Sequence, residues 1–257
     1  MTQNQFPDPT RTAAPPVAPV NTGSPLAPGV TASPATLGVQ PDSRLATAFL
    51  SQAFTWMFAG LLITAGVAYA VQSNARLLEF ANGSFFLLFI VQIGIVVGIT
   101  AAINRISATA ALLLFFVYAA SLGITMGLIV ASYTTGSVAV AFLSASAMFG
   151  AAAVYGRVTK RNLAALGGIL FMGLIGLLVA MVVNIFLQSS QVTWIISIVG
   201  VGLFTALTAY DVQRIQSGAI AAQLGSMEKA AVIGALQLYL DFINIFLFML
   251  RLLGGRG

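Results

Sequence analysis

Two acidic residues stand inside strongly apolar stretches near the C-terminal end of the chain. Asp211 lies in LFTALTAYDVQRIQ and Asp241 lies in GALQLYLDFINIFLFMLRLLG. An unpaired charge in the middle of a bilayer costs about 2.5–3.5 kcal/mol on insertion scales, so such carboxylates are usually paired, hydrated or protonated. Two of them in contact would share one proton, because like charges in a low dielectric do not both ionise cheaply. The chemistry that these residues predict is a pH-responsive element.

The remaining composition excludes most other chemistry. The chain has no cysteine and no histidine, which removes disulfides, thiol nucleophiles, iron–sulfur clusters, histidine-ligated haem and the usual zinc sites. We expect no cofactor. An intramembrane aspartyl protease would use both aspartates as an acid–base pair, but Asp241 follows Tyr239 and Leu240 instead of the Gly-x-Gly typical of such enzymes. We therefore do not expect an enzyme.

The elements that position these carboxylates are long apolar runs. Of 257 residues, 59% are hydrophobic and only 7% are charged, which is typical of a membrane protein. A span needs roughly 20 apolar residues, and continuous runs favour helices over the alternating strands of a barrel. The sequence predicts an all-α integral membrane protein with seven transmembrane helices, at about 46–71, 84–103, 108–131, 138–155, 163–187, 192–215 and 230–253.

The N-terminal segment differs from the rest of the chain. All nine prolines fall at or before Pro41, among many small polar residues. This composition predicts a disordered tail over residues 1–42, followed by the transmembrane domain over residues 43–257. No apolar run precedes Leu45, so we expect the first span, and not a cleaved signal peptide, to direct insertion.

Basic residues predict the orientation, because lysine and arginine in short loops tend to stay on the cytoplasmic side. A cytoplasmic N-terminus places eight of the eleven there, namely Arg11, Arg44, Arg105, Arg157, Lys160, Arg161, Arg214 and Lys229. The net charge of +5 is then a topology signal and implies no nucleic-acid partner. We expect a cell membrane (inner or plasma), with an organelle membrane as the alternative.

The predicted spans place the two carboxylates on neighbouring antiparallel helices. Asp211 lies near the cytoplasmic end of 192–215, while Asp241 is the twelfth residue of 230–253, about 17 Å along that helix. Contact requires that the first helix tilts or that the second begins later. Further polar side chains lie one helical turn from these carboxylates, namely Thr208, Gln237 and Asn244. Arg105, at the cytoplasmic end of 84–103, is the nearest candidate counter-charge.

Structural roles are the alternative for each of these residues. Polar side chains between membrane helices can act as packing contacts, and Asp211 could lie in the headgroup region near Arg214. Arg105 could be only a flanking charge that follows the orientation rule. Two Gly-x-x-x-Gly spacings, Gly94 with Gly98 and Gly123 with Gly127, could let helix backbones approach closely.

The two C-terminal stretches resemble the signature of the Bax inhibitor-1 family, also called the transmembrane Bax inhibitor motif family. Its sharpest parts are Ala209 to Asp211 with Gln213 and Ile215, then Leu238 to Asn244, and the seven-span plan extends the resemblance from about Leu45 to Gly254. It implies six helices around a central seventh and a paired-aspartate pH sensor, here Asp211 and Asp241, that controls a calcium leak. It also implies an arginine latch, for which Arg105 matches. Some relatives carry an acid in the second helix, where this chain has Gln92.

From the resemblance we expect a pH-sensitive calcium (cation) leak channel whose partners are the bilayer, calcium ions and protons. Ionised Asp211 would pair with Arg105 and close the cytoplasmic end, and protonation would loosen it. Asp211 and Asp241 would hold calcium only weakly and transiently, because two carboxylates fall short of the six to eight oxygen ligands of a storage site. The alternative is a regulatory membrane protein that binds a membrane protease or a cell-death or stress factor; deleting residues 1–41 should abolish such docking and spare a leak.

Overall fold

The structure is a computed structural model that describes residues 43–255, with side chains from residue 48 onward. The predicted disordered tail, residues 1–42, lies outside these described residues. Every regular element within residues 43–255 is a helix. The bounds are α1 Ser43–Gln72, α2 Ala75–Gly83, α3 Phe85–Ala102, α4 Ala108–Val130, α5 Thr135–Val158, the 3₁₀ helix η1 Leu163–Leu166, α6 Gly167–Leu187, α7 Ser190–Gln216, α8 Ala219–Leu224 and α9 Met227–Leu253.

Seven of the helices in the described part of the chain are long and apolar enough to cross a membrane. They are α1, α3, α4, α5, α6 with η1, α7 and α9, and their ends agree with the predicted spans to within three residues. The predicted all-α membrane class is therefore confirmed. The sequence prediction lacked α2 and α8, which are both too short to span.

Local sequence explains where the spanning helices begin. Four of them start after a hydroxyl side chain that accepts a hydrogen bond from the backbone N–H three residues on, which satisfies one of the free donors of a helix N-terminus. These caps are Ser107 for α4, Thr134 for α5, Ser189 for α7 and Ser226 for α9. Gly218 and Gly225 flank α8 with positive φ of 70° and 62°, a conformation that glycine adopts without steric cost.

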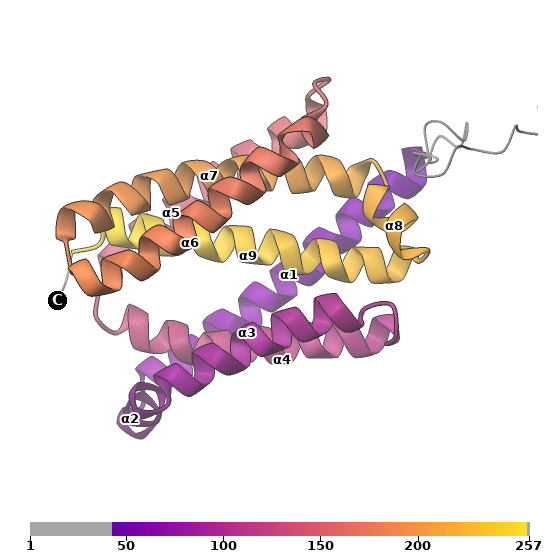
Figure 1. Cartoon of the computed structure of the whole chain (residues 1–257). Helices are drawn as coiled ribbons and strands as arrows, with labels where there is room; N and C mark the ends of the chain where they lie inside the picture. The colour runs from indigo at the N-terminus through magenta and orange to yellow at the C-terminus, as the bar shows by residue number, and fades with distance from the viewer. Residues whose placement is uncertain (1–42, 256–257) are drawn as a thin grey trace, which may run out of the picture. The chain divides into compact units, whose positions relative to one another are not determined.

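Helix α9 is the centre of the packing. It is the most buried of the spanning helices, and it packs against α1, α4, α5, α7 and α8. Figure 1 shows the yellow α9 between the pair α6 and α7 and the pair α3 and α4. Because α3 packs mainly on α4, and α6 mainly on α7, the placing of all six helices around α9 stays a prediction.

One Gly-x-x-x-Gly pair serves packing within the chain. A Cβ atom at Gly123 would lie 2.9 Å from the carbonyl oxygen of Thr64, and one at Gly127 would lie 2.8 Å from that of Ala68. Only glycine therefore permits the observed approach of α4 to α1. A Cβ atom at Gly94 or Gly98 of α3 would meet no other described helix within 4 Å, so this second spacing serves no contact within residues 43–255.

Candidate functional site

The register between α7 and α9 positions the two carboxyls. A Cβ atom at Gly200 of α7 would lie 2.5 Å from the ring of Phe248, and one at Gly234 of α9 would lie 2.9 Å from Cδ1 of Ile215. A glycine thus faces a large side chain near each end of this antiparallel pair. These two contacts align the middle of α9 with the last turns of α7.

In this register Asp211 and Asp241 are neighbours inside the protein. Asp241 is 4% exposed and Asp211 is 7% exposed. Asp241 lies seven residues after Gly234 and Asp211 lies four residues before Ile215, the residue that Gly234 faces, so the register places the two carboxyls within about one turn of each other along the helix pair. Both side chains are covered by protein, and a position of Asp211 at headgroup depth stays an alternative. Two buried carboxyls this close disfavour double ionisation, since like charges repel strongly where water is excluded.

The two carboxyls lie at different distances from the ends of their helices, and an offset between α7 and α9 brings them to the same level. Asp241 lies 14 residues after Met227, about 21 Å along α9, whereas Asp211 lies five residues before Gln216, about 8 Å from the end of α7. Ile215, the residue before the last of α7, faces Gly234, which lies seven residues after the start of α9. The helix thus begins beyond the end of α7, and its middle reaches Asp211.

Thr208 completes the contact between the helices. Its side chain is fully buried and donates its hydroxyl proton to the carbonyl oxygen of Phe204 at 2.8 Å. Thr208 lies seven residues before Ile215 and Asp241 lies seven residues after Gly234, which faces Ile215, so the register places Thr208 and Asp241 at the same level of the antiparallel pair.

Two buried acceptor oxygens on α9 are left without a partner. Oδ2 of Asp241 and Oε1 of Gln237 make no hydrogen bond to any described residue, and the two side chains are one turn apart on the same helix. A buried acceptor without a donor is costly and rare in proteins. A proton, a water molecule or a cation at this point would remove that cost. Asn244, the third predicted polar neighbour, instead donates its side-chain N–H to the carbonyl oxygen of Leu240 at 2.8 Å.

Arg214 follows Asp211 by three residues, about one turn along α7. Arg214 also donates to Oε1 of Gln223 at 3.0 Å, which ties the end of α7 to α8. Arg105 lies exposed in the turn between α3 and α4, and the neighbouring Asn104 carbonyl accepts a bond from Nζ of Lys229 at 3.5 Å. The turn is therefore near the start of α9, but the role of Arg105 as a latch stays a prediction.

A hydrogen-bonded pair two residues from Asp241 was not anticipated from the sequence. The hydroxyl groups of Tyr239 and Thr64 lie 2.6 Å apart, and Thr64 also bonds the carbonyl oxygens of Gly60 at 3.0 Å and Ala119 at 2.9 Å. This junction joins α1, α4 and α9. The sequence signal was weak, because Thr64 is one of three threonines in the predicted span 46–71 and the tyrosine is of a kind typical of packing.

Gln92 occupies the position where some relatives are expected to carry an acid. Its side chain is buried, and its Nε2 donates to the carbonyl oxygen of Ser121 at 3.0 Å and to Oγ1 of Thr125 at 2.8 Å. The amide therefore holds α3 against α4, away from the carboxyl pair on α7 and α9.

The carboxyl pair has few ligands for a metal ion. Among the described residues, no group of three or more Asp, Glu, His or Cys side chains comes together. A stable calcium site uses six to eight oxygens, so Asp211 and Asp241 with Gln237 suit a cation in passage better than a resident one.

Comparisons with known proteins agree with the signature in α7 and α9. A family model described as "Inhibitor of apoptosis-promoting Bax1" matches residues 46–257. The inner membrane protein YbhL of Escherichia coli K12 is 40% identical over 226 residues, which cover 85% of this chain and 95% of YbhL. A Borreliella burgdorferi protein is 42% identical over 81% of this chain and 92% of its own. A Streptococcus pyogenes membrane protein is 39% identical over 62% of this chain and 70% of its own.

Proposed function

The chain belongs to the Bax inhibitor-1 family of multi-pass membrane proteins, and from that premise we propose that it is a pH-sensitive leak pathway for calcium, gated by Asp211 and Asp241. The observation that carries the proposal is the burial of both carboxyls at neighbouring levels of the packed α7–α9 pair, with an unpartnered oxygen on Asp241. A purely structural pair would be expected to satisfy its acceptors.

The gating mechanism that we propose acts at the end of the bundle where α7, α8 and α9 meet. While Asp211 is ionised, its attraction to Arg214 one turn later on α7 and the Arg214–Gln223 bond hold this end together. Protonation of the pair removes the attraction, and the end loosens. A calcium ion that enters then meets two carboxyls and the Gln237 oxygen, which bind it weakly enough for it to leave.

A second closure in this proposal lies beside the pair. The Tyr239–Thr64 contact is two residues from Asp241 on α9, and both side chains are buried. An ion that crosses the bundle must part these hydroxyls or pass beside them. The closed contact represents the resting, non-conducting state.

We further propose that the N-terminus is cytoplasmic and that the membrane is the inner membrane of a bacterial cell. The orientation follows from the excess of arginine and lysine in the loops on the N-terminal side. The membrane follows from the printed name of the Escherichia coli relative. Protease accessibility of the tail in right-side-out and inverted vesicles would test the orientation.

The leak itself is tested by calcium flux into proteoliposomes at about pH 6 and about pH 8, both above the ordinary carboxyl pKa of about 4. Wild type should conduct more at the lower pH, and Asp211→Asn and Asp241→Asn should lose this dependence. Glu228→Gln is the matched control, because Glu228 is an exposed acid at the start of the same α9. If the folded wild type and variants match empty vesicles, the leak is wrong and a regulatory binding role takes its place, which deletion of residues 1–41 would then test.

A further inference from the structure

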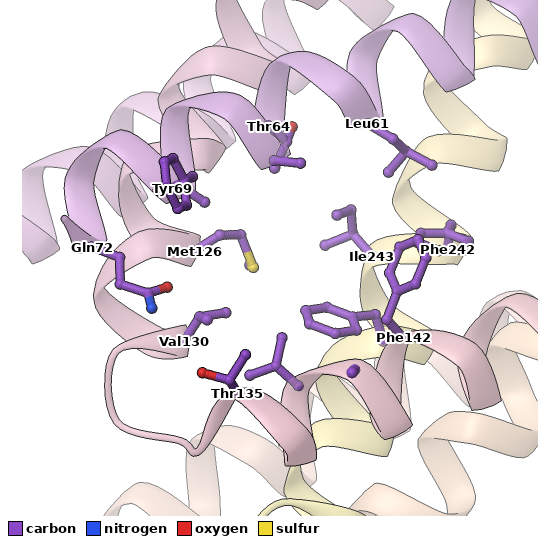
Figure 2. Close-up of a pocket in the computed structure, with 15 residues that line it drawn as sticks. Leu61, Thr64, Tyr69, Gln72, Met126, Val130, Thr135, Phe142, Phe242 and Ile243 are labelled. Carbon is purple, nitrogen blue, oxygen red and sulfur yellow. The ribbon is translucent and has the colours of Figure 1, made fainter. Parts of the chain in front are cut away.

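A cavity of about 360 Å³ lies between α1, α4, α5 and α9. Its walls are formed by aliphatic and aromatic side chains, among them Leu61, Met126, Phe142, Phe242 and Phe246. Figure 2 shows these groups surrounding an open space, with polar side chains gathered at one end. The volume is in the range of small-molecule sites in proteins, about 300–1,000 Å³.

The polarity of the lining changes along the cavity. Gln72, Tyr69 and Thr135 lie at one end; Gln72 is the last residue of α1 and Thr135 is the first residue of α5. These positions are the ends of spans, where lipid headgroups lie. Thr64 lies eight residues before Gln72, about 12 Å deeper along α1, and the wall at that depth is apolar.

Water and ions do not suit the deep part of this cavity. A buried water needs about three hydrogen-bond partners, and the Thr64 hydroxyl is already engaged by Tyr239, Gly60 and Ala119. The lining residues include no acidic or basic side chain. An empty space of this size would forfeit dispersion contacts along its whole wall, so an apolar occupant is favoured.

We propose that this cavity binds one acyl chain of a membrane phospholipid, inserted from the leaflet at the level of Gln72 and Thr135. A chain is the apolar molecule that the surrounding bilayer supplies, and its polar end would remain at headgroup depth. No lysine or arginine lines the mouth to hold the carboxylate of a free fatty acid, so the esterified chain of a phospholipid is the occupant.

The bound chain would also contact α9, the helix that carries Asp241. Phe242 and Ile243, which directly follow Asp241, both line the cavity. The chain would thus stabilise one position of α9 relative to α1. Binding itself does not depend on the proposed leak and can be measured without it.

Photo-crosslinking tests the proposal with a phosphatidylcholine that carries a diazirine near the end of one acyl chain. The protein is reconstituted with this lipid, illuminated, and mapped by mass spectrometry. Met126 is only 4% exposed and lines the cavity, whereas Phe86 on α3 is 81% exposed and reports ordinary contact with bilayer lipid. We expect labelling at both residues, and labelling at Phe86 without Met126 would overturn the proposal.

Substitutions of residues that line the cavity test whether labelling at Met126 comes from a chain inside the cavity or from lipid on the outer surface. Ala139→Phe on α5 or Ala65→Phe on α1 should lower labelling at Met126 by about tenfold, because the added ring fills the space that the chain needs. Ala147→Phe, on an exposed face of α5 outside the lining, should leave labelling at Met126 unchanged. Undiminished labelling in both cavity variants would refute an inserted chain. A diazirine fatty acid that labels Met126 in place of the phospholipid would refute the esterified source.

Discussion

Replacing Gly200 with alanine should separate the two helices that carry the carboxyls. The added Cβ would lie 2.5–2.7 Å from three carbon atoms of the Phe248 ring, whereas carbon atoms attract best at about 3.5–4.0 Å. The ring has little freedom to yield. It is 2% exposed, it packs on Phe204 at 6.0 Å between ring centroids, and the guanidinium of Arg251 lies 5.7 Å from its centre.

The expected cost follows from two opposing effects. Overpacking a well-filled interior costs about 1–3 kcal/mol, while alanine in place of glycine in a helix interior contributes about 0.5–1 kcal/mol of stability. Gly202 provides the control, because it lies on the same α7 and a Cβ there would meet no described atom within 4 Å. Gly202→Ala should gain the helix stability of alanine without any overpacking cost. The free energies of unfolding of the two variants should therefore differ by the overpacking cost alone, about 1–3 kcal/mol.

The assay is equilibrium unfolding in mixed micelles by added sodium dodecyl sulfate, followed by circular dichroism. Gly200→Ala should unfold at a lower fraction of the denaturing detergent than Gly202→Ala. The displaced α7 also moves Asp211 away from Asp241, so the pH dependence of calcium flux should weaken in Gly200→Ala alone. Equal stability of the two variants would refute the reasoning about the register.

Three further variants test the two proposed closures. Arg214→Gln should raise calcium flux at about pH 8, because it removes the cation beside ionised Asp211. Arg105→Gln should leave flux unchanged. A rise in flux in Arg105→Gln but not in Arg214→Gln would identify Arg105 as the latch. Tyr239→Phe removes the hydroxyl that contacts Thr64 and keeps the ring, at a cost of about 0.5–1.5 kcal/mol for the lost hydrogen bond. Flux should rise at both pH values in Tyr239→Phe while its pH dependence remains, and unchanged flux would exclude this junction as a closure.

The spans were predictable because each follows from a local property. A run of roughly 20 apolar residues suffices to mark a membrane helix, and a serine or threonine directly before the run marks its start. The short α2 and α8 lack the apolar run that marks a span. Asp211 and Asp241 were likewise visible from the sequence, since a carboxylate in an apolar helix is conspicuous.

The contacts between helices were not predictable in the same way. The register of α7 against α9 depends on Gly200 facing Phe248 and Gly234 facing Ile215, and no periodic pattern in either helix reveals these pairs. The Thr64–Tyr239 contact joins residues 175 positions apart. The sequence alone does not show that the Asp211 carboxyl is buried within the protein.

The central claim is that one proton is shared by the buried pair and that its loss and return gate the leak. Infrared difference spectroscopy of the reconstituted protein, titrated with pH, measures protonated carboxyl groups directly. The account predicts a band from a buried protonated carboxyl that is lost in Asp241→Asn and titrates over the same pH range as calcium flux. A wild-type protein with no such band, or a band that Asp241→Asn leaves unchanged, would contradict it.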